Sequence, residues 1–331
     1  MRGVHLGVRD ILPTPAEIRA AALRIAPHIV ATPFRRSEGL SEFLGGEVWL
    51  KLECEQATGS FKIRGATNAL LLLSAAERAR GVVTASAGNH GLGIASAAKA
   101  LGINATVFVP RGAPAVKRDR IAQLGATIDA TAHGYDAAEI AARAFALKSG
   151  ATFVSPCSGR AVLAGQGTIA LEMLGELPSL ETVILSVGGG GLAGGVGGLL
   201  RVEASTAQIV GAQSERTNAM ALALASGRPT DIPDLPTLAD GLAGLVDAEM
   251  LAQGQAALDE VAVVTEEDIE NAIAYLWIEE GHKVEGAGAA GVAALLSGKV
   301  RTLRFPVAVV VSGGNIDAAK IEEILDGAHE R

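Results

Sequence analysis

The stretch ETVILSVGGGGLAGG, residues 181–195, joins an apolar run to four consecutive glycines and then to a segment with a helical pattern. Residues 182–187 are apolar at most positions, as expected for a strand whose two faces are both covered by helices. Backbone N–H groups of a glycine loop at a helix start can bind a phosphate, helped by the positive end of the helix. Four glycines in a row carry a large entropy cost, so a simple tight turn is the less favoured interpretation. The stretch therefore predicts a phosphate-binding strand–loop–helix unit.

A second interpretation of this loop stays open, because residues 189–194 also spell GxGxxG, the fingerprint of dinucleotide-binding sites. Such a site needs an acidic residue about 20 positions further on, at the end of the next strand. That strand reads QIVGAQ and ends at Gln213, whereas Glu215 comes two residues later. A nicotinamide-dependent dehydrogenase is thereby weakened as an alternative but not excluded. A P-loop is excluded, because no GxxxxGK[ST] motif occurs.

Outward from this loop, short β-branched runs alternate with alanine-rich helical runs. Strands are expected at residues 48–51, 81–85, 105–109, 127–130, 152–154, 182–187, 208–212, 261–264 and 306–311. Helices are expected, among others, at residues 15–25, 91–100, 115–124, 136–147, 167–176, 266–279 and 287–296. This alternation predicts an α/β fold with parallel sheets. Further glycine-bearing junctions read TASAGNHG, ADGLAG and SGGN, and because ligands bind beyond the carboxyl ends of parallel strands, we expect these loops to converge on one cleft.

Length and composition narrow the class of protein. The 331 residues suit two domains better than one, and with 49% apolar but only 3% aromatic residues the core must consist of Ala, Val, Leu and Ile. The net charge is −8 and no Lys/Arg-rich tract occurs, so nucleic-acid binding is not expected. Cys54 and Cys157 are too few for a disulfide framework. Neither a signal-type run near the N-terminus nor an uninterrupted apolar stretch of 18 residues occurs, so we expect a cytoplasmic protein without a membrane span.

The stretch TGSFKIRGA, residues 58–66, places Lys62 between two apolar side chains. Ser60 is a candidate N-cap, which would put Lys62 in the first turn of a helix. The positive helix end and burial both favour a neutral amine, which is the form that imine chemistry requires. On this segment alone an exposed surface lysine is the commoner outcome. The interpretation therefore depends on the other loops.

Four motifs occur in the order SFK, AGNH, GGGG and SGGN, and together they resemble fold type II (β-family) pyridoxal-phosphate enzymes. Within that family the chain is similar to the threonine/serine dehydratases and the serine racemases, from residue 31 to residue 317. The resemblance implies a tryptophan synthase β-like α/β fold with two domains of twisted, parallel-rich sheets flanked by helices. Residues 1–74 and 156–331 would form a large domain that binds pyridoxal 5'-phosphate. Residues 75–155 would form a small mobile domain that carries the SAGNH loop.

The resemblance also implies a role for each residue of the motifs. Lys62 would form the Schiff base with the cofactor and later take the Cα proton. Ser312 would contact the pyridine nitrogen, and because a hydroxyl does not keep this nitrogen protonated, the ring would be a weaker electron sink that suits elimination. The other cofactor contacts would be Phe61, Asn89, Gly188, Gly189, Gly190, Gly191, Leu192, Gly241 and Glu285, and the substrate would meet Ser86, Ala87, Asn89 and His90.

Purely structural roles stay open at three of these positions. His90 could contact backbone at a helix start, Ser312 could cap a strand end, and Glu285 could serve a helix dipole.

Departures from related groups sort the chain within the family. Serine racemases carry a serine where this chain has Ala87, and cysteine and threonine synthases show Lys-Asp-Arg where Lys62 is followed by isoleucine and arginine. Gln213 stands where relatives often hold a divalent cation with a glutamate, so no metal site is expected. The chain ends soon after Asp317, so no regulatory domain and no control by isoleucine are expected.

The expected activity is elimination of water from L-threonine or L-serine, giving a 2-oxo acid and ammonia. Alternatives are a dehydratase for another β-hydroxy amino acid, of the 3-hydroxyaspartate or hydroxyectoine-catabolism type, and, less favoured, serine racemisation or cysteine-synthase-like β-replacement. A cofactor-binding protein without turnover is the alternative from another class. We expect an amino-acid substrate and a homodimer or homotetramer.

Overall fold

The computed structural model describes residues 11–329. Its strands are β1 (Phe34–Arg36), β2 (Val48–Lys51), β3 (Val82–Ala85), β4 (Ala105–Pro110), β5 (Thr127–Ala132), β6 (Thr152–Phe153), β7 (Thr182–Ser186), β8 (Gln208–Ser214), β9 (Glu260–Val264) and β10 (Val307–Val310). Its α-helices are α2 (Pro15–Ile25), α3 (Glu38–Leu44), α4 (Lys62–Leu71), α5 (Ala75–Arg80), α6 (Asn89–Leu101), α7 (Ala115–Gln123), α8 (Tyr135–Ser149), α9 (Arg160–Glu176), α10 (Gly191–Glu203), α11 (Ala219–Ser226), α12 (Ala248–Ala257), α13 (Glu266–Ile278), α14 (Gly286–Leu296) and α15 (Ala318–His329). Short 3₁₀ helices are η1 (Ala26–His28), η2 (Glu53–Glu55) and η3 (Asp240–Leu242). Residues 1–10, part of the stretch that lacks a signal-type run, lie outside the described residues.

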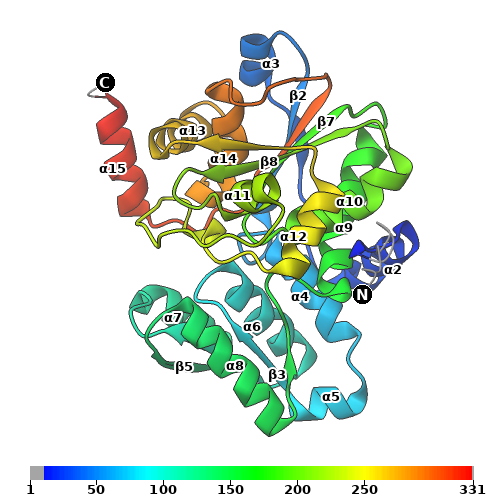
Figure 1. Cartoon of the computed structure of the whole chain (residues 1–331), viewed down its shortest axis with the longest axis vertical. Coiled ribbons are helices and arrows are strands. Elements are labelled where there is room, and N and C mark those ends of the chain that lie inside the picture. The colour runs from blue at the N-terminus through cyan, green and yellow to red at the C-terminus, as the bar shows by residue number, and fades with distance from the viewer. Residues whose placement is uncertain (1–10, 330–331) are drawn as a thin grey trace.

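The strands form two sheets, one in each part of the molecule (Figure 1). The larger sheet has six strands in the order β1-β2-β10-β7-β8-β9, and every neighbouring pair is parallel except β1 with β2. The smaller sheet has four strands in the order β5-β4-β3-β6, all parallel. The predicted α/β class with parallel-rich sheets is confirmed.

Helices cover both faces of the larger sheet, which explains the near-continuous apolar run of β7. Ile184 belongs to a buried cluster with residues of α13 and α14. Its neighbours Val183 and Leu185 belong to the opposite cluster, which includes residues of α2, α9, α10 and α12. Because successive side chains of a strand point to opposite faces, a strand buried on both faces needs apolar residues throughout.

The smaller sheet is packed in the same way. Val82 lies in a cluster with residues of α4, α6 and α7, and Val83 lies in the opposite cluster with residues of α8. This sheet spans residues 82–153 and lies in the lower part of Figure 1. The domain boundaries at residues 75 and 155, and the mobility of the segment between them, stay predictions.

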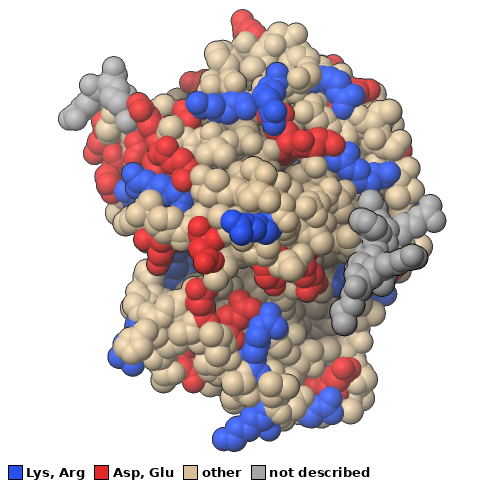
Figure 2. All heavy atoms as spheres, viewed as in Figure 1, with Lys and Arg blue, Asp and Glu red and all other residues tan. Residues whose placement is uncertain are grey.

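Figure 2 shows acidic and basic side chains interspersed over the face in view. Among residues 11–329, no helix combines the length and the apolar character that crossing a membrane requires.

Candidate active site

A cavity of about 800 Å³ is lined by loops that follow strands of both sheets. All of the residues that the sequence singled out for cofactor or substrate line it: Phe61, Lys62, Ser86, Ala87, Asn89, His90, Gly188, Gly189, Gly190, Gly191, Leu192, Gly241, Glu285 and Ser312. The structure thus brings these residues together as the strand-end rule predicts. The individual role of each residue stays a prediction.

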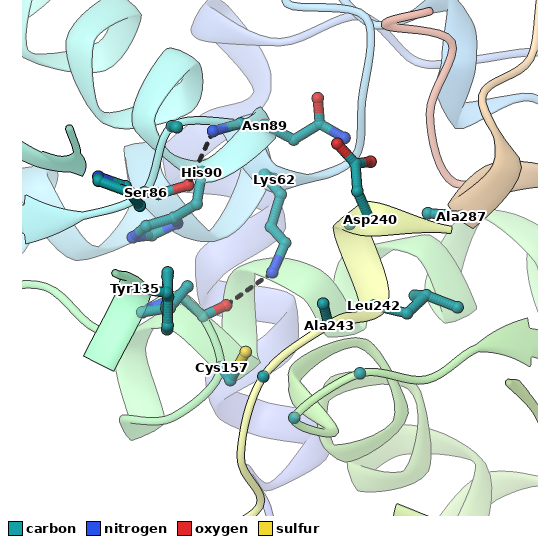
Figure 3. Close-up of a pocket in the computed structure, with 18 of the residues that line it drawn as sticks. Lys62, Ser86, Asn89, His90, Tyr135, Cys157, Asp240, Leu242, Ala243 and Ala287 are labelled. Atoms are coloured by element: carbon teal, nitrogen blue, oxygen red, sulfur yellow. Dashed lines mark hydrogen bonds between the residues drawn. The ribbon is translucent and has the colours of Figure 1, made fainter. Parts of the chain in front are cut away.

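Lys62 is the first residue of α4, and the segment before it is pinned to the loop that follows β10. The Phe61 N–H donates to the carbonyl of Ser312 at 3.1 Å, and Ser60 pairs with Gly313 in an isolated antiparallel bridge. The Lys62 Nζ donates to the carbonyl of Pro156 at 2.8 Å, as Figure 3 shows, and lies 5.2 Å from the centre of the Phe61 ring. The amine is therefore held inside the cavity rather than on the outer surface.

The prediction that Ser60 is the N-cap of this helix is wrong. The N-cap residue is Phe61, which makes no side-chain capping hydrogen bond, whereas Ser60 is fully buried and its hydroxyl has no partner among the described residues. Ser60 is instead held through its backbone by Gly313, and its hydroxyl takes no part in the helix start.

The glycine loop between β7 and α10 presents unused hydrogen-bond donors to the cavity. The backbone N–H groups of Gly189, Gly190, Gly191 and Leu192 make no hydrogen bond to any described residue. Gly190 has a φ of 85°, a backbone conformation that favours glycine. A Cβ on Gly191 would lie 3.0 Å from the Cα of Cys157, so this glycine allows the loop after β6 to approach. Free N–H groups at the positive end of a 13-residue helix form a site for a phosphate.

The loop after β3 presents a second set of donors at the start of α6. The Ser86 hydroxyl accepts from the Gly88 N–H at 3.2 Å, while the N–H groups of Asn89 and His90 have no acceptor in the part of the chain that the structure describes. A carboxylate placed at this helix start would meet free N–H groups and the positive helix end.

His90 itself is a buried, neutral imidazole. Burial, and then the nearby charge of Lys62, lower the pKa of His90 to about 3. Its Nε2 lies 3.2 Å from the carbonyl of Val154, and since a carbonyl only accepts, Nε2 carries the proton and Nδ1 does not. This contact agrees with the alternative that the His90 side chain contacts backbone at a helix start. His90 would then contact a bound carboxylate through its backbone N–H.

The remaining edge of the cavity carries Glu285 and Ser312. Burial raises the pKa of Glu285 to about 7, and the charge of Asp240 adds to this, while a hydrogen bond from Asn89 and the charge of Lys117 oppose it. The Ser312 side chain is buried, and its hydroxyl makes no hydrogen bond to any described residue. A lone hydroxyl that faces a cavity is available to a ligand.

Several lining residues escaped the sequence analysis. Cys157 and Tyr135 line the cavity together with Lys62 (Figure 3), and each follows a strand of the smaller sheet, β6 and β5 respectively. The strand-end rule, applied to every strand, would have found both. Lys117 and Arg120 line the cavity from α7, and no local pattern marks them. Gln213, considered earlier as a cation ligand, uses its amide within the protein, donating to the Thr217 carbonyl at 2.9 Å and accepting from the Ala221 N–H at 2.9 Å.

Comparisons with known proteins agree with this arrangement. A family model described as pyridoxal-phosphate dependent enzyme matches residues 25–313. The L-threonine ammonia-lyase of Thermotoga maritima is 42% identical over 317 residues, which cover 95% of this chain and 78% of that protein. The structure of maize serine racemase matches with a TM-score of 0.89 at 31% identity, covering 96% of this chain and 98% of the other. Threonine deaminase isoform 2 from Solanum lycopersicum, in its processed form, matches with a TM-score of 0.86 at 30% identity, over 96% and 91% of the two chains.

Proposed function

Because that family model spans most of its length, the chain belongs to the pyridoxal-phosphate-dependent enzymes, and we propose that it is an ammonia-lyase for L-threonine or L-serine. The reaction removes water from the β-hydroxy amino acid and yields a 2-oxo acid and ammonia. The observation that carries the proposal is the amine of Lys62, which lies in one cavity with the free N–H groups of the glycine loop and the unpartnered Ser312 hydroxyl.

The residues present fit the cofactor. The free N–H groups of residues 189–192 suit its phosphate, and the Ser312 hydroxyl suits its ring nitrogen. Phe61 and Asn89 line the same cavity as Lys62, and they suit the face of the cofactor ring and its phenolic oxygen respectively. When bound, pyridoxal phosphate supplies an aldehyde that binds amines and a ring that withdraws electrons from the substrate Cα.

Lys62 would hold the cofactor through its amine and, with substrate bound, accept the Cα proton. Its hydrogen bond to the Pro156 carbonyl fixes the direction of the side chain within the cavity. The N–H groups at the start of α6 would hold the substrate carboxylate and so orient the Cα–H bond. The imidazole of His90 is neutral, so it brings no positive charge that would draw the carboxylate away from these N–H groups.

Ala87 supports elimination over racemisation. Its methyl group lines the cavity in the loop after β3, where it can neither give nor take a proton. Racemisation needs a proton donor on the face of the substrate opposite Lys62. The structural likeness to maize serine racemase is therefore a likeness of fold and of cofactor chemistry.

We also propose the domain division at residues 75 and 155, with a mobile small domain, a homodimer or homotetramer, and a cytoplasmic location. The continuous smaller sheet within residues 82–153 supports the division. Light scattering during size-exclusion chromatography measures the assembly.

The experiment that tests the function is a substrate screen with the cofactor-loaded protein. Serine, threonine and both diastereomers of 3-hydroxyaspartate are incubated separately, and 2-oxo acid and ammonia are quantified together with the chirality of the remaining amino acid. We expect equal amounts of oxo acid and ammonia from L-threonine and L-serine. If oxo acid forms from 3-hydroxyaspartate alone, the substrate is 3-hydroxyaspartate and not threonine or serine. If L-serine is converted to D-serine and no oxo acid forms, elimination is refuted.

A further inference from the structure

Helix α7 of the smaller-sheet part reaches the larger-sheet part through two basic side chains. Lys117 Nζ lies 2.5 Å from Asp240 Oδ2, and Arg120 Nη2 donates to Asn315 Oδ1 at 2.8 Å. Lys117 and Arg120 are three residues apart, so they share one face of the helix. All four side chains line the cavity. These two contacts of α7 with the larger-sheet part therefore lie at the site itself.

The contact of Arg120 continues as a chain of hydrogen bonds into the cavity. The Asn315 Nδ2 donates to the carbonyl of Thr58 at 2.8 Å and to Asn89 Oδ1 at 2.7 Å. The Asn89 Nδ2 in turn donates to Glu285 Oε1 at 2.5 Å. The chain thus connects α7, the loop after β10, the start of α6 and the start of α14.

The ends of this chain determine which way both amides point. A carbonyl such as that of Thr58 only accepts, and the guanidinium of Arg120 only donates, so the Asn315 nitrogen faces Thr58 and its oxygen faces Arg120. Reversing the Asn315 amide would set oxygen against oxygen at Thr58 and at Asn89, and nitrogen against nitrogen at Arg120. With Asn315 fixed, Asn89 keeps its oxygen toward Asn315 and its nitrogen toward Glu285. One N–H of that nitrogen then remains for a ligand in the cavity.

We propose that Asn315 is a positioning residue that orients the Asn89 amide toward the cofactor, and that Arg120 makes this orientation depend on α7 lying against the loop after β10. Asn315 acts through Asn89, and Arg120 acts through Asn315. The inference rests on the proposed contact between Asn89 and the cofactor. Closure of α7 onto the larger-sheet part and completion of the cofactor site are then one event.

The test compares N315D, R120A, R120K and the double variant R120A/N315D as cofactor-loaded proteins. N315D keeps the shape and an acceptor for Arg120 but cannot donate to Thr58 or Asn89. R111A is the matched control, because the exposed Arg111 is in the same part of the chain and its guanidinium hydrogen-bonds, among the described residues, only the carbonyl of Thr131. Each protein is titrated with pH without substrate, following the visible absorption of the bound cofactor, and kcat and KM are then measured with L-threonine.

We expect N315D to move the midpoint of the spectral titration and to lower kcat about tenfold, the effect of one lost hydrogen bond to a reacting group. R120A should change both readouts in the same direction by about threefold, because its bond is exposed. R120K should recover part of the effect, R111A should match the wild type, and the double variant should be no worse than N315D.

Two results would overturn the proposal: an unchanged spectral titration in N315D, or a double variant whose loss is the product of the two single losses. The spectral titration is measured without substrate and so needs no turnover. A protein that binds the cofactor but releases no ammonia therefore refutes the proposed function while still deciding this one.

Discussion

Replacing Arg64 with methionine tests whether the buried charge cluster behind α4 holds the lysine-bearing helix in place. Arg64 is fully buried, and its guanidinium makes five hydrogen bonds, two to Glu53, two to Glu172 and one to Thr168. Burial opposes this charge, yet the two carboxylates raise the pKa of Arg64 above its ordinary value. Arg64 does not line the cavity, so its contribution is to the position of α4 and not to a ligand.

The cost follows from what each carboxylate keeps after the change. Glu172, whose side chain is 24% exposed, still has Lys51 at 2.6 Å. Glu53, with 0% exposed, keeps only the hydroxyl of Thr32 among the side chains of residues 11–329. A buried charge that loses its partner costs about 3–5 kcal/mol, so we expect the free energy of unfolding to fall by that amount.

Urea denaturation of the cofactor-free protein measures this change. Arg19→Met is the control, because it breaks the exposed pair with Glu203 and should cost less than about 1 kcal/mol. The double variant R64M/E53M removes both charges of the buried Arg64–Glu53 pair and should recover a large part of the loss. A loss below about 1 kcal/mol for R64M, or a double variant less stable than R64M, would refute the reasoning.

The other predictions concern the cavity. The pKa of Glu285 is raised from 4.5 to about 7 in the fold, so the carboxyl favours folding while protonated, and up to about 3 kcal/mol of stability is lost as pH rises from about 4.5 through 7. The cofactor-free wild type should therefore lose thermal stability over this range relative to Glu285→Gln. Asp240 and Lys117, the neighbouring charges, are the same in both proteins. Melting temperatures that change equally with pH in the two proteins would count against the prediction. Gly190→Ala should weaken cofactor binding about tenfold in a fluorescence titration, because a φ of 85° costs a side chain about 1–2 kcal/mol. Gly175→Ala, in α9 with nothing within 4 Å of the added Cβ, should bind the cofactor normally, and equal effects of the two changes would contradict the loop argument.

Strands with both faces buried were the most predictable feature of the fold. The predicted strand at residues 48–51 and helix at residues 15–25 match β2 and α2 at both ends. Most other predicted elements differ by one to three residues, whereas α9 begins at Arg160, seven residues before the expected start. Strand β1 was missed because its three residues, with two exposed arginines, carry no apolar period. The strand order was not predictable, because the pairing of β10 with β2 and β7 joins segments far apart in the chain.

Site residues in glycine loops were predictable, and those on helix faces were not. The loops around Asn89, Gly190 and Ser312 follow strands, so the strand-end rule predicted that they meet at one cavity, whereas Lys62 was singled out by the resemblance of the four motifs. Arg120 lies in the middle of an ordinary helix, and only the approach of the two sheets gives it a partner. Such contacts depend on tertiary structure that local pattern does not encode.

Ammonia release from L-threonine by the Lys62→Ala variant tests the central claim most directly. The variant, the wild type and Lys99→Ala, which removes an exposed lysine from α6, are loaded with pyridoxal phosphate and assayed together. Because Lys62 is proposed to move the Cα proton, we predict a loss of at least about a thousandfold for Lys62→Ala and none for Lys99→Ala. Full ammonia release by Lys62→Ala would contradict the account, and a wild type that releases none from any β-hydroxy amino acid would favour a cofactor-binding protein without turnover.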